Sequence, residues 1–109
     1  MDTKPIKDLL LEVQEGASVG RLADIAVQLT SYYATLSEEF KDIEVFRADR
    51  WLELRKDVKS DTMAEKMWLA TSEGKNWNGL RIQLKYIEKT ISSIKLRLKV
   101  AEGERFGAY

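Results

Sequence analysis

The chain contains no cysteine and no histidine among its 109 residues. The first absence excludes disulfides, thiol nucleophiles and thiolate metal ligands, and the second excludes the side chain that most often acts as a general base near neutral pH. No phosphate-binding loop and no convincing pair of catalytic carboxylates takes their place. We therefore predict that the protein is not an enzyme and has no catalytic residues, no metal site and no cofactor.

The chain also lacks long apolar runs and an excess of either charge. No apolar run reaches the roughly eighteen residues that a membrane-spanning helix needs, and the first residues lack the apolar core of a signal peptide. Lys and Arg number 18, as do Asp and Glu, so any affinity for nucleic acid must come from local segregation of charge. These features predict a cytoplasmic protein that does not bind membranes.

Apolar residues make up 44% of the chain and recur at helical spacing, and the single proline, Pro5, lies near the start. The pattern predicts a short helix from a Thr3 cap to Gly16 and a long helix from a Ser18 cap. The phase of this long helix is lost over 46–51, where a kink, a stutter or a wider buried face could each explain the change. A polar break over 59–62 then precedes a third helix that reaches Val100.

Two glycines, Gly74 and Gly79, weaken this third helix locally and indicate either a short interruption or a close crossing with another helix. The expected fold is therefore all-α, a helical hairpin or bundle of one short and two long helices. It forms a single domain over 1–100, and 101–109 form a flexible C-terminal tail.

The two long helices carry more apolar surface than one hairpin can cover, so we predict a homo-oligomer that pairs through these stripes. The candidate interface residues are Leu29, Tyr33, Leu36, Phe40, Trp77, Leu84, Ile87, Ile91, Ile94 and Leu98.

A row of cations lies beside the apolar stripe of the third helix. Its members are Arg81, Lys85, Lys89, Lys95, Arg97 and Lys99. Six basic residues against Glu88 alone give this segment a local charge of plus five, which could collect several phosphates of a nucleic acid. Tyr86 lies nearby and could stack on a base. The competing interpretation is a solvated helix face whose cations suit the negative end of the helix dipole.

Acidic residues gather in the second helix, at Glu38, Glu39, Asp42 and Glu44, interrupted by Lys41. They could receive a basic partner or pair with the basic helix of a neighbouring subunit. The alternative is again a solvated face.

The layout from Lys56 to Lys99 resembles that of the T4-type phage recombination mediators (UvsY-like), small helical proteins with a polar break, a Trp-containing helix and a terminal basic stretch. The corresponding parts here are Lys59-Ser60-Asp61, Trp77 and Ile94-Lys95-Leu96-Arg97. The resemblance covers less than half of the chain. It implies an oligomer that binds single-stranded DNA, with Lys95 and Arg97 as strand contacts, and that helps load a recombinase onto DNA coated with single-strand-binding protein.

These observations predict a small phage-type accessory protein of DNA recombination or replication, located in the host cytoplasm. It would self-assemble and bind single-stranded nucleic acid through the basic helix face, with a recombinase or a single-strand-binding protein as a further partner. The alternative is a helical protein-interaction module without nucleic-acid binding, such as a phage-encoded inhibitor or a scaffolding or assembly factor.

Overall fold

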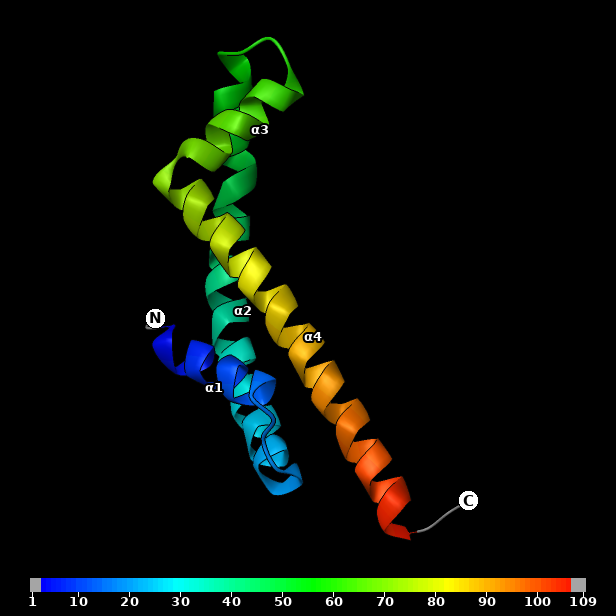
Figure 1. Cartoon of the computed structure of the whole chain (residues 1–109). Helices are drawn as coiled ribbons and strands as arrows, with labels where there is room; N and C mark the ends of the chain where they lie inside the picture. The colour runs from blue at the N-terminus through cyan, green and yellow to red at the C-terminus, as the bar shows by residue number, and fades with distance from the viewer. Residues whose placement is uncertain (1–2, 107–109) are drawn as a thin grey trace. The chain divides into compact units, whose positions relative to one another are not determined.

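The structure is a computed structural model that describes the backbone of residues 3–106 and the side chains of residues 3–103. Within these residues the chain forms four α-helices and no strand: α1 (Lys4–Gln14), α2 (Val19–Lys56), α3 (Asp61–Ala70) and α4 (Ser72–Phe106) (Figure 1). The predicted all-α class is confirmed. Over the same residues, no helix combines the length and the apolar content that crossing a membrane requires.

Short polar segments set the helix ends. Gly16 has a φ of 91°, a left-handed conformation that glycine adopts without steric cost, and it turns the chain between α1 and α2. The hydroxyl oxygen of Ser18 accepts the N–H of Arg21 at 3.3 Å, and that of Ser60 accepts the N–H of Met63 at 3.2 Å. Both serines thus cap helices: the Ser18 cap is the predicted one, and Ser60 lies in the predicted polar break.

The predicted third helix is in fact two helices, because α3 ends at Ala70 and α4 begins at Ser72. The interruption lies at Thr71, whose extended backbone has a φ of −72° and a ψ of 158°. Of the two alternatives that Gly74 and Gly79 left open, a short interruption at the glycines is excluded, since α4 runs through both positions.

Gly74 instead allows a close approach next to that break. A Cβ atom at this position would overlap the carbonyl oxygen of Trp68 and lie 2.6 Å from its carbonyl carbon. The Thr71 hydroxyl donates to the same carbonyl oxygen at 2.6 Å and accepts the N–H of Gly74 at 2.9 Å. Thr71 therefore closes α3 and caps α4 in one turn.

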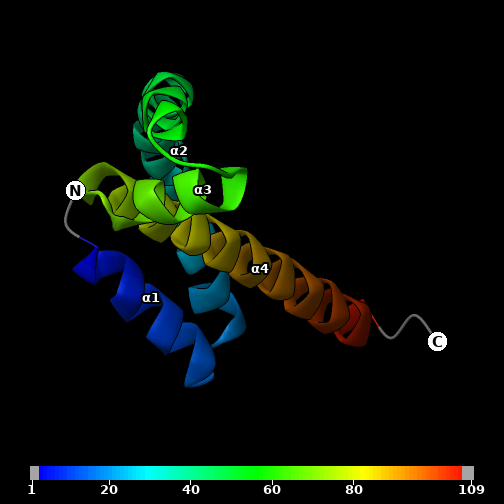
Figure 2. The same cartoon turned by 90° about the horizontal axis from the view of Figure 1, so that it is seen from above.

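The helix α2 is continuous through residues 46–51, where the apolar pattern loses phase. Over this stretch α2 contacts a second helix, α3. Phe46 contacts Trp68 with ring centroids 6.3 Å apart, and Arg47 pairs with Glu65 at 3.3 Å. The helix α3 thus doubles back along the last part of α2 (Figures 1 and 2), while Phe46, Ala48 and Leu52 remain exposed.

Packing contacts divide the chain, predicted as one domain, into two compact units. Unit 1 comprises Met1–Ala34 and Lys85–Tyr109, and unit 2 comprises Thr35–Leu84. The helix α4 also continues to Phe106. Residues 101–106 of the predicted tail are thus helical, and residues 107–109 of that tail lie outside the described residues.

The core of unit 1 is formed by α1, the first part of α2 and the last part of α4. Its buried apolar side chains are Ile6, Leu9, Val13, Leu22, Ile25, Leu29, Ile87 and Ile94. Burial of each such side chain is worth about 1.5 to 3 kcal/mol. The helix α1 therefore covers apolar surface that the sequence analysis assigned to a second subunit.

An ion pair between Glu12 and Arg21 joins the end of α1 to the start of α2. Arg21 donates from Nη2 to Oε1 of Glu12 at 2.9 Å and from Nε to the other carboxylate oxygen. These hydrogen bonds, with a smaller contribution from the charge of Arg21, lower the pKa of the Glu12 carboxyl against the opposing effect of desolvation. The same contact raises the pKa of Arg21.

Unit 2 packs around Trp68, which is fully buried. The ring of Trp77 meets Trp68 edge to face at 6.3 Å and stacks on Phe40 at 6.1 Å. Such aromatic pairs add to the free energy of apolar burial. The other buried apolar residues of this unit are Leu36, Ala64, Leu80 and Leu84.

Candidate nucleic-acid interface

Five of the six predicted cations lie on the part of α4 that belongs to unit 1. We call these five residues, Lys85, Lys89, Lys95, Arg97 and Lys99, the basic face. All five are exposed. The apolar residues of the same segment, Ile87 and Ile94, are fully buried on the opposite side of the helix. Amphipathic packing of α4 therefore holds the cations in solvent, as the sequence pattern predicts.

The four lysines of the basic face form no ion pair with any described residue. Glu88 is the one acidic residue between positions 81 and 99. Its carboxylate accepts a hydrogen bond from the hydroxyl group of Tyr33 in α2. The positive charge of the face is thus available to an anionic partner.

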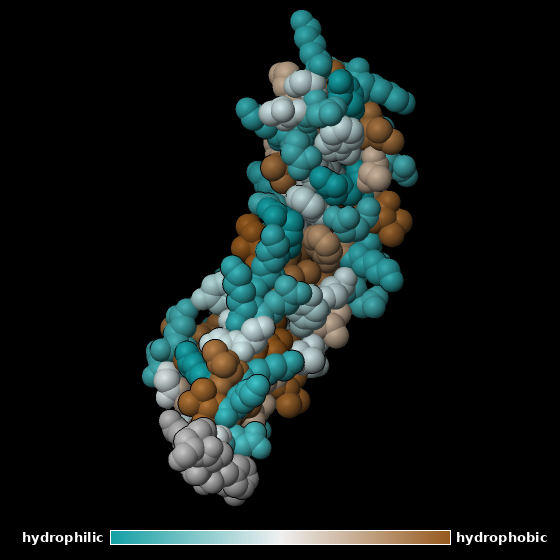
Figure 3. Space-filling view, turned by 90° about the vertical axis from the view of Figure 1, so that its right-hand side faces the viewer, coloured by the Kyte–Doolittle hydropathy of each residue, from teal (hydrophilic) through white to brown (hydrophobic). Residues whose placement is uncertain are grey.

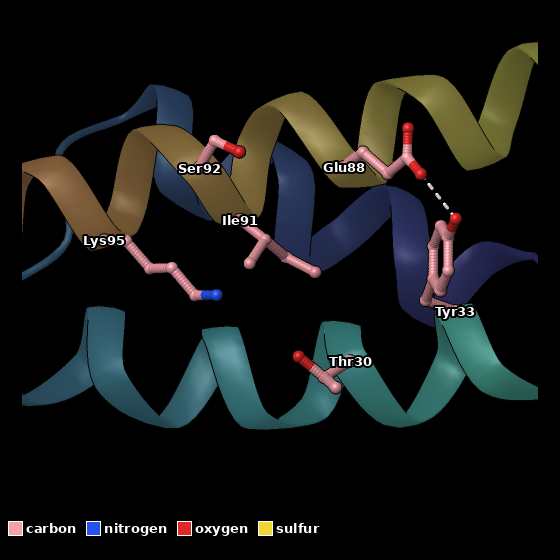
Figure 4. A pocket seen from close by; sticks show the side chains of 6 residues that line it. All are labelled: Thr30, Tyr33, Glu88, Ile91, Ser92 and Lys95. Atoms are coloured by element: carbon pink, nitrogen blue, oxygen red, sulfur yellow. Dashed lines mark hydrogen bonds between the residues drawn. The ribbon is translucent and has the colours of Figure 1, made fainter.

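A groove of about 480 Å³ runs beside the basic face, between α4 and the first part of α2. Its lining residues are Thr30, Tyr33, Glu88, Ile91, Ser92 and Lys95 (Figure 4). In Figure 4 the ammonium group of Lys95 extends from α4 into the space between the two helices, and Ile91 points into the same space. The hydrogen bond between Tyr33 and Glu88 closes one end. The groove offers a cation, a serine hydroxyl and apolar surface together.

A second hollow, of about 250 Å³, lies on the other side of α4, next to the end of α1. Its lining residues are Val13, Gln14, Tyr86, Lys89, Thr90, Ser93 and Arg97. The side-chain amide of Gln14 donates to the Tyr86 hydroxyl at 2.7 Å, and Arg97 donates to the carbonyl oxygen of Val13 at 3.4 Å. The helix α1 thereby positions one aromatic ring and one guanidinium group of the predicted site.

The hydroxyl groups of the two hollows differ in what they can donate. Thr30 donates to the carbonyl oxygen of Ala26 at 2.8 Å, and Thr90 donates to that of Tyr86 at 2.9 Å. A hydroxyl group has one hydrogen, so these two threonines can only accept. Ser92 and Ser93 make no hydrogen bond to another described residue, and they can donate to a phosphate oxygen. The sequence analysis missed both serines, although their places between the lysines were a usable signal.

Arg81, the sixth predicted cation, belongs to unit 2 and is engaged there. Its guanidinium group lies 5.4 Å from the centre of the Trp77 ring and donates to Oδ1 of Asn78 at 2.6 Å. Trp77 also donates from its indole nitrogen to the carboxylate of Glu44. These contacts hold both residues in the packing of unit 2, and Arg81 is not part of the basic face.

Half of the predicted interface residues are covered by the chain itself. Leu29, Leu36, Leu84, Ile87 and Ile94 are buried, and Tyr33, Phe40, Trp77, Ile91 and Leu98 are half-buried. The buried five therefore contribute to the cores of the two units and present no surface to a second subunit in this structure. Among the described residues, no group of three or more Asp and Glu side chains is placed to hold a metal ion.

Comparisons of the chain with models of known protein families, with curated proteins and with solved structures found no match.

Proposed function

We propose that the protein binds single-stranded nucleic acid through the basic face of α4. The observation that carries this proposal is the exposure of five cations whose only acidic neighbour within the segment, Glu88, is hydrogen-bonded to Tyr33. A backbone of phosphates would complement these charges and release its condensed counterions on binding. Ser92 and Ser93 add neutral hydrogen-bond donors between the cations.

The number of cations in the basic face sets how steeply the binding constant should fall with salt concentration. For single strands the logarithm of the binding constant falls with the logarithm of salt concentration by about 0.7 for each neutralised phosphate. Five neutralised phosphates give a slope of about −3.5, so a fourfold increase in salt weakens binding about a hundredfold. A contact dominated by apolar burial would respond far less.

The proposed preference for a single strand rests on surfaces that only an unstacked base can reach. Tyr86 is 45% exposed beside Lys89 and Arg97, so part of its ring is open to stacking. The groove offers apolar contact from Ile91 next to Lys95. Bases held in a duplex are already paired and stacked, and they gain nothing from either surface.

The biological setting that we propose comes from the resemblance to the UvsY-like mediators. The protein would act as a phage-type accessory factor of DNA recombination or replication in the host cytoplasm. A recombinase or a single-strand-binding protein would then be its protein partner.

A charge-reversal experiment tests the site. The variant Lys85→Glu, Lys89→Glu, Lys95→Glu should bind a labelled single-stranded oligonucleotide at least about a hundredfold more weakly than the wild type in fluorescence anisotropy. The matched control changes three exposed lysines of unit 2, Lys59, Lys66 and Lys75, to Glu. Equal loss of binding in both variants would show that net charge, and not this site, determines affinity. Circular dichroism of both variants should show the helical content of the wild type.

A second candidate is a helical protein-interaction module without nucleic-acid binding, such as an inhibitor or a scaffolding or assembly factor. The observation that favours it is the exposure of large apolar side chains in unit 2: Val45 is 76%, Leu52 is 55% and Met63 is 52% exposed. Hydrophobic side chains are visible among hydrophilic ones on the face shown in Figure 3, and a protein partner could cover apolar surface of this kind. Wild-type protein that leaves the anisotropy of the oligonucleotide unchanged at low salt would favour this candidate.

A further inference from the structure

The solvent side of α2 in unit 2 carries a regular row of carboxylates and apolar side chains. Its members are Glu38, Asp42, Val45, Asp49 and Leu52, and we call them the acidic seam. All five are exposed, including the two large apolar side chains. None of the three carboxylates forms an ion pair with another described residue. The seam thus exposes both charge and apolar surface that the chain itself leaves uncovered.

The acidic seam overlaps with, but differs from, the group of acidic residues identified in the sequence analysis. Glu44 is exposed but accepts the indole N–H of Trp77, another residue of unit 2, and Glu39 is half-buried. Only Glu38 and Asp42 of that patch face solvent on the seam. Asp49, which the sequence analysis did not include, extends it along the helix.

The solvent side of α4 in unit 1 carries a row of the same spacing and of opposite charge. We call Lys85, Lys89, Ser92, Leu96 and Lys99 the basic seam. In both seams successive members lie four, three, four and three residues apart, which is the spacing of helices that pair along their length. Each seam runs over fifteen residues of helix, and its first and last members lie about 21 Å apart along the axis.

We propose that the acidic seam of one copy of the chain docks on the basic seam of a second copy. Charge complementarity supports this occupant, because the two seams of a chain with no net charge carry opposite signs. Leu96 is 64% exposed in the basic seam, and Val45 and Leu52 are 76% and 55% exposed in the acidic one. Pairing would remove part of this apolar surface from water.

The geometry of such a contact decides the kind of assembly. The two seams are different surfaces, so each contact is heterologous. Such contacts form a ring where the rotation between copies closes and an open series where it does not. A single helix-to-helix contact is smaller than the roughly 800 Å² per partner of a standard interface. Association should therefore be weak and should increase with protein concentration.

This inference shares lysines with the proposed function but does not depend on it. A nucleic-acid strand and the acidic seam of a second copy both need Lys85, Lys89 and Lys99. The acidic seam therefore competes with a strand for the same surface. Self-association is measured without nucleic acid, so either proposal can fail while the other stands.

Analytical ultracentrifugation across a range of protein concentrations tests the docking. At low salt the average mass of the wild type should rise above the 12.6 kDa of one chain as concentration increases, and added salt should reverse the rise. The variant Glu38→Lys, Asp42→Lys, Asp49→Lys and the variant Lys85→Glu, Lys89→Glu, Lys99→Glu should each associate at least about tenfold more weakly, because like charges then face each other.

Mixing these two variants should restore association, since each reversed seam meets a seam of opposite charge. The variant with Lys59, Lys66 and Lys75 changed to Glu has the same net charge as the basic-seam variant but keeps both seams. It should associate when the basic-seam variant does not. A wild type that stays at the mass of one chain at every concentration would overturn the proposal. So would an acidic-seam variant that associates as the wild type does.

Discussion

Replacing Gly74 with alanine should damage the turn between α3 and α4, although alanine favours helices. The added methyl carbon would overlap the carbonyl oxygen of Trp68 and lie 3.0 Å from the hydroxyl oxygen of Thr71. Neither is the flexible end of a long side chain. The carbonyl oxygen belongs to the backbone of α3, and the hydroxyl group is fixed by two hydrogen bonds. The backbone of the turn must therefore shift.

The expected loss in the free energy of unfolding is the sum of two contributions. Overpacking of a tight site costs about 1 to 3 kcal/mol. A shift that breaks the hydrogen bond from the Gly74 N–H to Thr71 costs about 1 kcal/mol more. We expect Gly74→Ala to lower the free energy of unfolding by about 2 to 4 kcal/mol, a large share of the stability of a small domain.

Gly79 supplies the matched control in the same helix. A Cβ atom at Gly79 would meet nothing within 4 Å, so Gly79→Ala should stabilise the protein by about 0.5 to 1 kcal/mol through helix propensity. Urea unfolding followed by circular dichroism compares the two variants. Equal stability of Gly74→Ala and Gly79→Ala would refute the reasoning, because it would mean that the Trp68 carbonyl does not restrict position 74.

Two further predictions concern single contacts. Ser60→Ala removes the hydroxyl that accepts the N–H of Met63, and it should lower the free energy of unfolding by about 1 kcal/mol in the same urea assay; an unchanged midpoint would exclude a stabilising cap. Because the pKa of Glu12 is lowered in the folded chain, its pair with Arg21 should stabilise the protein at neutral pH and lose this effect as pH falls through the lowered pKa. Glu12→Gln should therefore melt below the wild type at neutral pH and match it in strong acid, whereas a difference that persists in acid would contradict this role.

Periodicity predicted the helices well because it reports which face of each helix is apolar. The stripe through Leu80, Leu84, Ile87 and Ile94 is buried, as a 3.6-residue period implies. The break at Thr71 was missed because the apolar phase continues across it. The local signal was Thr71 followed three residues later by Gly74. The threonine hydroxyl caps the next helix, and the glycine leaves room for the Trp68 carbonyl group.

Contacts between segments that are distant in the sequence were harder to predict. The apolar stripes of the long helices were assigned to contacts with a second subunit because one hairpin encloses little core. In unit 1, α1 instead contributes buried side chains to the core, namely Ile6, Leu9 and Val13. Nothing in the spacing of these residues states which helix they contact. Similarly, the sequence analysis placed Arg81 in the row of cations, but it did not predict that the guanidinium group lies over the Trp77 ring. The basic face could be predicted because exposure on an amphipathic helix follows from sequence alone.

The central claim is that the basic face of α4 binds single-stranded nucleic acid. The most direct test is the fluorescence anisotropy of a labelled single-stranded oligonucleotide titrated with the wild-type protein at several salt concentrations, with a duplex of the same length as control. We predict tighter binding of the single strand and a slope near −3.5 in the logarithmic salt plot, for about five neutralised phosphates. No binding at low salt, or equal binding of strand and duplex, would contradict the claim.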